Sequence, residues 1–63
     1  MNFEQWMDGF KQYPHQRIGQ SWFNYLSLYR LDIAKELSGI DDCDCFYLDN
    51  LVPAFLSAVE VRW

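Results

Sequence analysis

Apolar side chains recur at helical spacing along almost the whole chain, and this periodicity restricts the fold more than any other feature of the sequence. Near the start, Phe3, Trp6, Met7 and Phe10 fall at positions i, i+3, i+4 and i+7, which places them on one face of a helix. Similar spacing returns in the later segments. The pattern predicts an all-α fold: a small compact bundle of three to four short helices that forms one domain, residues 1–63.

The first predicted helix begins after Asn2 and ends near Lys11. Asn2 is a favourable N-cap, and Gln5 occupies the position from which a side chain completes a capping box. Pro14 restricts the residue before it to an extended conformation, so the chain is expected to leave the helix before this proline. The first helix is therefore short and amphipathic.

The second predicted helix is the longest and runs from Pro14 or His15 to Tyr29. Gly19 lies beside its apolar stripe, and a glycine inside a helix costs about 1 kcal/mol relative to alanine. The close approach of a neighbouring helix would explain this glycine. The stripe is also wide enough for packing on more than one side; it consists of Ile18, Trp22, Tyr25, Leu26 and Tyr29, widened by Phe23 and Leu28.

A short third helix is predicted with Asp32 as its N-cap. Gly39 follows at a position where a glycine in the left-handed conformation often ends a helix, and Ile40 is expected to make the apolar contact that accompanies such an ending. Residues 41–45 are acidic and poor in helix formers. They predict a loop, followed by one helical turn over residues 46–48.

The last helix is predicted to begin at Asp49 or Asn50 and to continue to Trp63. Either residue can cap the helix, and Pro53 then falls in the first turn, where its missing N–H group costs little. Residues 59–61 alternate between apolar and polar side chains, which leaves a strand as the alternative. This segment is short and has no evident pairing partner, so the helix is favoured.

The number of aromatic rings is high for so short a chain. Three tryptophans, four tyrosines and five phenylalanines give twelve rings in 63 residues. Each ring can bury roughly 150–250 Å², which helps a domain whose size allows only about 60% of the unfolded surface to be buried. A core this small cannot enclose all of them. Some rings are therefore expected at the surface, where tyrosine and tryptophan often dominate binding interfaces.

Negative charge gathers in the second half of the chain. Residues 1–30 carry two acidic and three basic residues, a sum of +1, whereas residues 31–63 carry seven acidic and two basic residues, a sum of −5, for a total of −4. Five scattered basic residues do not provide the basic surface that nucleic-acid binding needs. A partner with a basic surface is expected instead. The aspartates are densest at Asp41, Asp42, Asp44 and Asp49.

No group of residues has the arrangement of a catalytic site. The single histidine, His15, belongs to no recognisable motif with a serine or cysteine nucleophile. Adjacent acids such as Asp41 and Asp42 are typical of loop charges, since acid and base catalysis needs a cleft that separates their pKa values. The glycines are isolated, so no phosphate-binding loop is predicted. The chain is expected to be no enzyme and to use no cofactor.

Cys43 and Cys45 are separated by one residue, and a disulfide between them would close a small strained ring. Zinc is the less favoured alternative, because structural zinc sites use a second pair of ligands that this chain lacks. Calcium sites place oxygen ligands and a glycine where these cysteines lie. The favoured interpretation has solvated aspartates and inward-facing thiols, with no bound metal.

The beginning of the chain has neither a basic segment nor a long apolar run. The sequence therefore predicts no signal peptide and no transmembrane span. Free thiols suit a reducing compartment, so a cytoplasmic location is expected.

Four segments resemble a group of small uncharacterised phage and bacterial proteins. Residues 17–26 match the pattern R-x-G-Q-x-x-F-N-x-L, and residues 30–34 match R-x-D-[LI]-A. Residues 44–49 match D-x-F-Y-x-D, and residues 52–55 match [IV]-P-x-F. The resemblance implies a phage or mobile-element origin. It implies no activity and no site residues, and the two cysteines do not belong to its pattern.

Small phage-type proteins without catalytic residues usually bind a larger host protein. The favoured hypothesis is therefore a small acidic protein-binding module that inhibits or modulates a host protein, using aromatic anchors and the acidic segment. A homo-oligomeric structural or assembly protein is the alternative, and a nucleic-acid mimic is a weaker one. The candidate partner-binding residues are Tyr13, Arg17, Trp22, Tyr47, Asp42 and Asp44.

Overall fold

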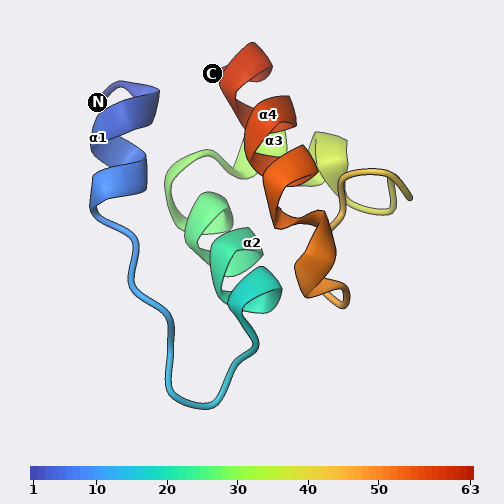
Figure 1. Ribbon diagram of the computed structural model, residues 1–63. Coiled ribbons are helices and arrows are strands. Elements are labelled where there is room, and N and C mark those ends of the chain that lie inside the picture. Colours follow the sequence, from blue (N-terminus) through green and yellow to red (C-terminus); the bar gives the residue numbers. More distant parts are fainter.

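The computed structural model describes residues 1–63 and is built from helices, turns and loops (Figure 1). The all-α prediction is confirmed, and residues 59–61 lie within the last helix. The elements follow in the order α1 (Phe3–Asp8), α2 (Ile18–Tyr29), α3 (Leu31–Leu37), a short 3-10 helix η1 (Asp49–Leu51) and α4 (Val52–Arg62).

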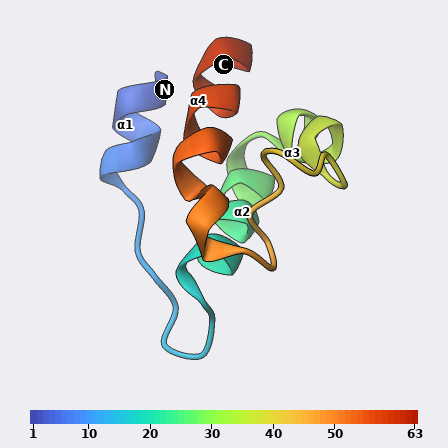
Figure 2. The same ribbon diagram turned by 45° about the vertical axis from the view of Figure 1, so that its right-hand side comes forward.

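The helix α2 lies at the centre of the molecule and packs against α3 and α4. In Figures 1 and 2, α1 stands on one side of this arrangement, and the loop between α3 and η1 lies on the opposite side. The two ends of the chain are close together, because the indole N–H of Trp63 donates a hydrogen bond to the carbonyl of Met1 at 3.1 Å.

The predicted capping box at the start of α1 is present. The side chain of Asn2 accepts a hydrogen bond from the backbone of Gln5, and the Gln5 side chain accepts one from the backbone of Asn2. The helix ends at Asp8, earlier than the predicted end near Lys11. The reason is that Gly9 caps it, with its N–H group bonded to the carbonyl of Trp6 in a tighter turn.

The helix α2 begins at Ile18, so the predicted start at Pro14 or His15 was wrong. A hydrogen bond from the N–H group of Gln16 to the carbonyl of Tyr13 closes a separate turn around the proline. The proline's fixed φ suits such a turn as well as it suits a first helical turn.

The buried face of α2 differs from the predicted stripe, because Ile18 and Tyr29 are exposed at its two ends. Of the predicted positions, Phe23, Tyr25 and Leu26 are buried, and the Phe23 ring packs against that of Phe55 on α4 with centroids 5.7 Å apart. Rings from the α1 side cover another part of α2. The expectation of packing on more than one side is therefore confirmed.

The helix α3 begins at Leu31, with Arg30 as its N-cap. Asp32 was predicted as the cap but lies in the first turn, where its carboxylate accepts two hydrogen bonds from the guanidinium group of Arg30, both at 3.1 Å. Gly39 follows the helix with a φ of 80°, as its sequence position predicted. Ile40 is exposed.

The connection from α3 to α4 contains a turn at residues 41–43, where the N–H groups of Cys43 and Asp44 both bond to the carbonyl of Ile40. The helical turn predicted over residues 46–48 is absent, because this stretch runs against α2. We call residues 40–48 the acidic loop. Pro53 lies in the first turn of α4, as predicted.

One cluster of eleven buried side chains forms the core. Helices and the acidic loop all contribute to it, which makes the loop part of the packed structure. Its members are Trp6, Phe23, Tyr25, Leu26, Ile33, Ala34, Leu37, Cys43, Cys45, Phe55 and Val59.

The left-handed conformation of Gly39 leads to a stability prediction. An added Cβ meets no atom within 4 Å, so the substitution Gly39→Ala tests backbone conformation alone. We expect it to lower the free energy of unfolding by about 1 kcal/mol, because side chains other than asparagine and aspartate are strained there. Gly39→Asn is the matched control and should cost less than half as much. Urea denaturation would measure both, and equal stability of Gly39→Ala and the unsubstituted chain would contradict the prediction.

Candidate functional site

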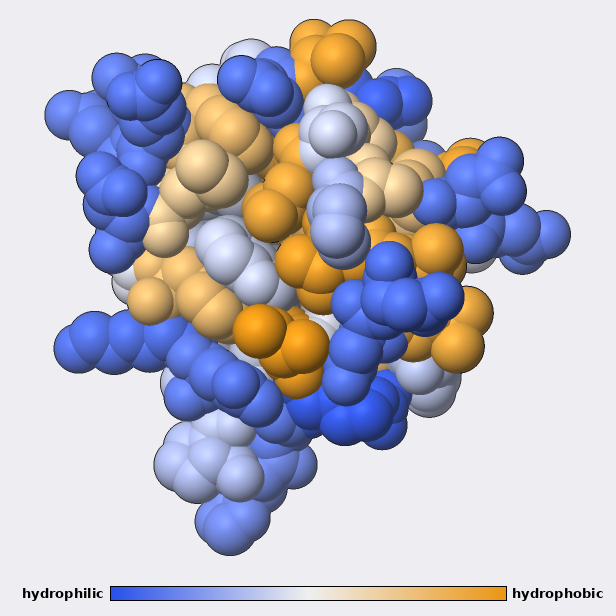
Figure 3. All heavy atoms as spheres, in the orientation of Figure 1, coloured by the Kyte–Doolittle hydropathy of each residue, from blue (hydrophilic) through white to orange (hydrophobic).

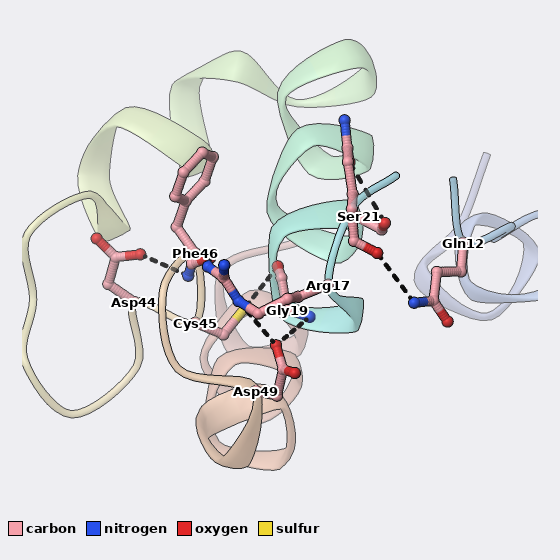
Figure 4. A network of polar contacts seen from close by, with 9 residues as sticks. Gln12, Arg17, Gly19, Ser21, Asp44, Cys45, Phe46 and Asp49 are labelled. Carbon is pink, nitrogen blue, oxygen red and sulfur yellow. Dashed lines mark hydrogen bonds and ion pairs between the residues drawn. The ribbon is translucent and has the colours of Figure 1, made fainter. Parts of the chain in front are cut away.

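The acidic loop touches the first turn of α2 at Gly19 (Figure 4). A Cβ on this glycine would lie 2.1 Å from the carbonyl oxygen of Cys45 and 3.1 Å from Oδ1 of Asp49. The close approach predicted for Gly19 is therefore present, but the neighbour is the backbone of a loop and not a helix. A glycine is needed here because only it leaves room for that carbonyl.

Asp49 caps α2 from outside the helix. The N-cap residue Arg17 makes no capping hydrogen bond with its own side chain. The backbone N–H group of Gly19 instead donates a hydrogen bond to Oδ1 of Asp49 at 3.0 Å. A carboxylate at this end of a helix satisfies an unpaired N–H group and faces the positive end of the helix dipole. Asp49 was predicted only as a cap for the last helix.

Arg17 connects the start of α2 to the end of the acidic loop. Its Nη2 donates a hydrogen bond to the carbonyl of Phe46 at 2.8 Å, and its Nε lies 3.7 Å from Oδ1 of Asp49. The guanidinium carbon is 6.0 Å from the centre of the Tyr47 ring. Two of the predicted binding residues, Arg17 and Tyr47, are thus neighbours. Tyr47 is 77% exposed, so most of its ring is free for another contact.

Cys45 lies beneath this contact and is completely buried. Its thiol donates a hydrogen bond to the carbonyl of Gly19, with Sγ and oxygen 3.2 Å apart. Burial raises the pKa of the Cys45 thiol from 9.0 to about 12, and it also raises the pKa of Cys43. Since the thiolate is the nucleophile and metal ligand, both side chains remain in the unreactive form near neutral pH. No group of three or more His, Cys, Asp or Glu side chains is placed to hold a metal ion.

The two aspartates selected from the sequence have different surroundings. Asp44 accepts hydrogen bonds from the N–H groups of Gly39 at 2.8 Å and Phe46 at 3.0 Å, so its carboxylate holds the loop together. Asp42 is exposed, as is the neighbouring Asp41, and neither takes part in the three ion pairs of the chain. The free negative charge of the loop is therefore at Asp41 and Asp42.

Tyr13 and Trp22 lie away from the acidic loop. Tyr13 is 46% exposed, and its backbone N–H group donates to the hydroxyl of Ser21 at 3.3 Å. Trp22 is half-buried and stacks on Phe10, with ring centroids 3.7 Å apart and planes 2° from parallel. The candidate residues thus fall in two places, with Arg17, Asp42, Asp44 and Tyr47 on or beside the loop.

Two apolar side chains of the loop are exposed, Ile40 and Leu48, although Ile40 was expected to make an apolar contact at the end of the third helix. The role of Asp49 at Gly19 was not predicted from the sequence. The pattern D-x-F-Y-x-D held a signal for this role, because both of its aspartates, Asp44 and Asp49, bind backbone N–H groups of other segments.

Comparison with known proteins gave no match: no protein-family model, no curated protein and no solved structure is significantly similar to this chain. The resemblance to phage proteins therefore stays a prediction. The surface has no pocket, and none of the helices has the length and apolar character needed to cross a membrane.

The contact at Gly19 predicts that replacing this helix glycine with alanine lowers the stability of the chain, the opposite of the usual effect. Gly→Ala inside a helix normally stabilises by up to about 1 kcal/mol. Gly19→Ala should instead destabilise the chain by about 3 kcal/mol, because the new methyl group pushes the loop away from α2. Leu28→Ala on the same helix is the control, since this side chain is 70% exposed. Thermal unfolding would show whether Gly19→Ala raises or lowers the stability of the chain. Any gain in stability would contradict the contact between Gly19 and the loop.

The buried thiol of Cys45 predicts a loss of stability at alkaline pH. Its folded pKa of about 12 exceeds the ordinary value of 9.0, so above pH 9 only the unfolded chain releases this proton. The free energy of unfolding should then fall by about 1.4 kcal/mol per pH unit from this group. Cys45→Ser keeps a donor for Gly19 but does not titrate in this range. Urea denaturation between pH 7 and 11 should show a steeper decline for the unsubstituted chain, and parallel curves would exclude this linkage.

Proposed function

We propose that this chain is a protein-binding module that docks on a larger protein through the acidic loop. The observation that carries the proposal is the exposed Tyr47 ring on a loop that also presents the free carboxylates of Asp41 and Asp42. Tyrosine is one of the residue types that dominate protein interfaces. Carboxylates that form no ion pair within the chain can attract a partner of opposite charge. The exposed side chains of Ile40 and Leu48 add apolar area around this anchor.

The distribution of ion pairs supports a basic partner. Each arginine is already paired within the chain: Arg17 with Asp49, Arg30 with Asp32, and Arg62 with Glu36. No arginine therefore balances the charge of Asp41 and Asp42. A basic surface on the partner would be attracted to the loop, which raises the rate of association more than the final affinity.

The hydrogen bonds that hold the loop against α2 and Gly39 support binding without a large entropy cost. Its backbone is held by the carboxylate of Asp44 on one side and by Arg17, Gly19 and Cys45 on the other. Loops that are ordered before binding lose little conformational freedom when they dock. Tyrosine adds contact area with few rotatable bonds.

The class of partner follows from the resemblance to small phage proteins. Such a protein would act in the host cytoplasm by occupying a basic surface of a host protein and so inhibiting or modulating it. The acidic loop would repel nucleic acid, which needs a positively charged surface. Mimicry of nucleic acid has weaker support, because Asp44 and Asp49 are already bound within the chain.

A homo-oligomeric structural protein is the second candidate, and one observation favours it. Leu28 and Tyr29 at the end of α2 and Leu31 at the start of α3 are each exposed. A second copy could cover this apolar surface. Light scattering at micromolar concentration separates the candidates, because the binding module should be a monomer and the assembly protein should not.

Substitution of Tyr47 tests the proposed function. Affinity purification of the tagged chain from host lysate should recover one stoichiometric partner, and Tyr47→Ala should weaken its binding at least about 30-fold, the loss of a hot-spot residue. Asp41→Asn with Asp42→Asn should slow association and reduce its dependence on salt. Val61→Ala is the control, because Val61 is 84% exposed on α4, outside the loop. Recovery of no stoichiometric partner, or unchanged binding by Tyr47→Ala, would rule out this interface.

A further inference from the structure

The arginines and the lysines of the chain differ in their contacts. Each arginine pairs with a carboxylate, whereas neither Lys11 nor Lys35 forms an ion pair. A guanidinium group is planar and carries five donors, so it can bind a carboxylate and a second acceptor together, while an ammonium group acts as a point charge. Every arginine also donates a hydrogen bond to a backbone carbonyl, and the pairs are Arg17 with Phe46, Arg30 with Trp63, and Arg62 with Ala58.

Two of these arginines lie over an aromatic ring. The guanidinium carbon of Arg17 is 6.0 Å from the centre of the Tyr47 ring, and that of Arg30 is 5.1 Å from the centre of the Trp63 ring. The negative face of an aromatic ring attracts a cation, and arginine is found there more often than lysine. A ring beside a carboxylate is therefore the arrangement with which this chain holds a guanidinium group.

The acidic loop presents both of these groups to the solvent. Its Tyr47 side chain is 77% exposed, so Arg17 covers only a small part of it. Asp41 and Asp42 are also exposed, and neither carboxylate pairs with a cation of the chain. The loop therefore has a ring and two carboxylates available for a further guanidinium group, one that the chain itself does not supply.

The acidic loop is short, and its two ends are held together. The carboxylate of Asp44 accepts hydrogen bonds from the N–H groups of Gly39, just before the loop, and Phe46, near its end. Figure 3 shows hydrophilic residues projecting from the side of the molecule on which this loop lies in Figure 1. The surface has no pocket. A guanidinium group needs none, because it stacks on the outside of a ring.

We infer that the acidic loop recognises an arginine side chain of the partner, an inference that rests on the proposed docking through this loop. The guanidinium group of the partner lies on the exposed part of the Tyr47 ring, and the carboxylates of Asp41 and Asp42 balance its charge. Lysine fits less well, because its ammonium group is more strongly hydrated and does not stack. The charge of Arg17 is already balanced by Asp49, which lowers the repulsion between Arg17 and a second cation.

Two short peptides test this inference on the full-length chain. The probes are acetylated and amidated peptides of glycine and serine that carry either arginines or lysines at the same positions. Titration followed by nuclear magnetic resonance should show shifts at the amides of Tyr47 and Asp42. The arginine peptide should bind about threefold more tightly, which is the strength of a cation–π contact at an exposed site. Equal affinity for the two peptides would overturn the inference.

Substitutions at position 47 identify the group that selects arginine. Tyr47→Phe keeps the ring and should retain the preference for the arginine peptide, whereas Tyr47→Leu should bind both peptides equally, through charge alone. Asp41→Asn with Asp42→Asn should weaken the binding of both peptides. Val61→Ala is the control, because Val61 is 84% exposed outside the loop. A preference for arginine that survives in Tyr47→Leu would also overturn the inference, as would the absence of binding by either peptide.

The peptide titrations and the affinity purification from host lysate give independent answers. A recovered partner whose binding needs Tyr47, together with equal affinity for the two peptides, would leave the proposed function in place and exclude the arginine. A preference for the arginine peptide without a recovered partner would support the arginine site on the loop and exclude the proposed function.

Discussion

The approach of the acidic loop to the first turn of α2 determines much of the remaining structure. Without a Cβ at Gly19, the carbonyl of Cys45 can lie against the helix, and the carboxylate of Asp49 can reach its free N–H group. A helix end needs such a partner for its unpaired donors and its dipole. The same contact fixes where α2 begins, how the loop runs and where η1 leads into α4. It is also why Tyr47 has a defined position beside Arg17.

Local signals in the sequence predicted that the chain forms a few short helices, but not all of their boundaries or the contacts between them. The capping box of Asn2 and the left-handed Gly39 act within a few residues, and both were predicted correctly. The start of α2 was placed too early, because Pro14 is compatible with a turn and with a helix. The cap that does operate there, Asp49, lies 30 residues from Gly19. No local pattern links two positions that far apart.

The candidate site was predictable in its chemistry but only partly in its geometry. Tyr47 and Trp22 were chosen for the same reason, as rings suited to an interface, yet one is exposed and the other stacks on Phe10. The Trp22 ring is covered because Phe10, twelve residues earlier, folds back on it, and sequence spacing alone does not predict that contact. Asp42 and Asp44 differ for a more local reason: the carboxylate of Asp44 accepts hydrogen bonds from the N–H groups of Phe46, two residues on, and Gly39, five residues back, whereas Asp42 stays exposed.

All three tryptophans of the chain, Trp6, Trp22 and Trp63, lie where α1 packs on α2 and on the end of α4. Their emission spectrum is therefore a probe of one end of the molecule, whereas circular dichroism in the far ultraviolet averages over every helix. The two signals need not change together when the chain is heated. A gap between their transition midpoints would measure how independently α1 behaves, without any label or substitution.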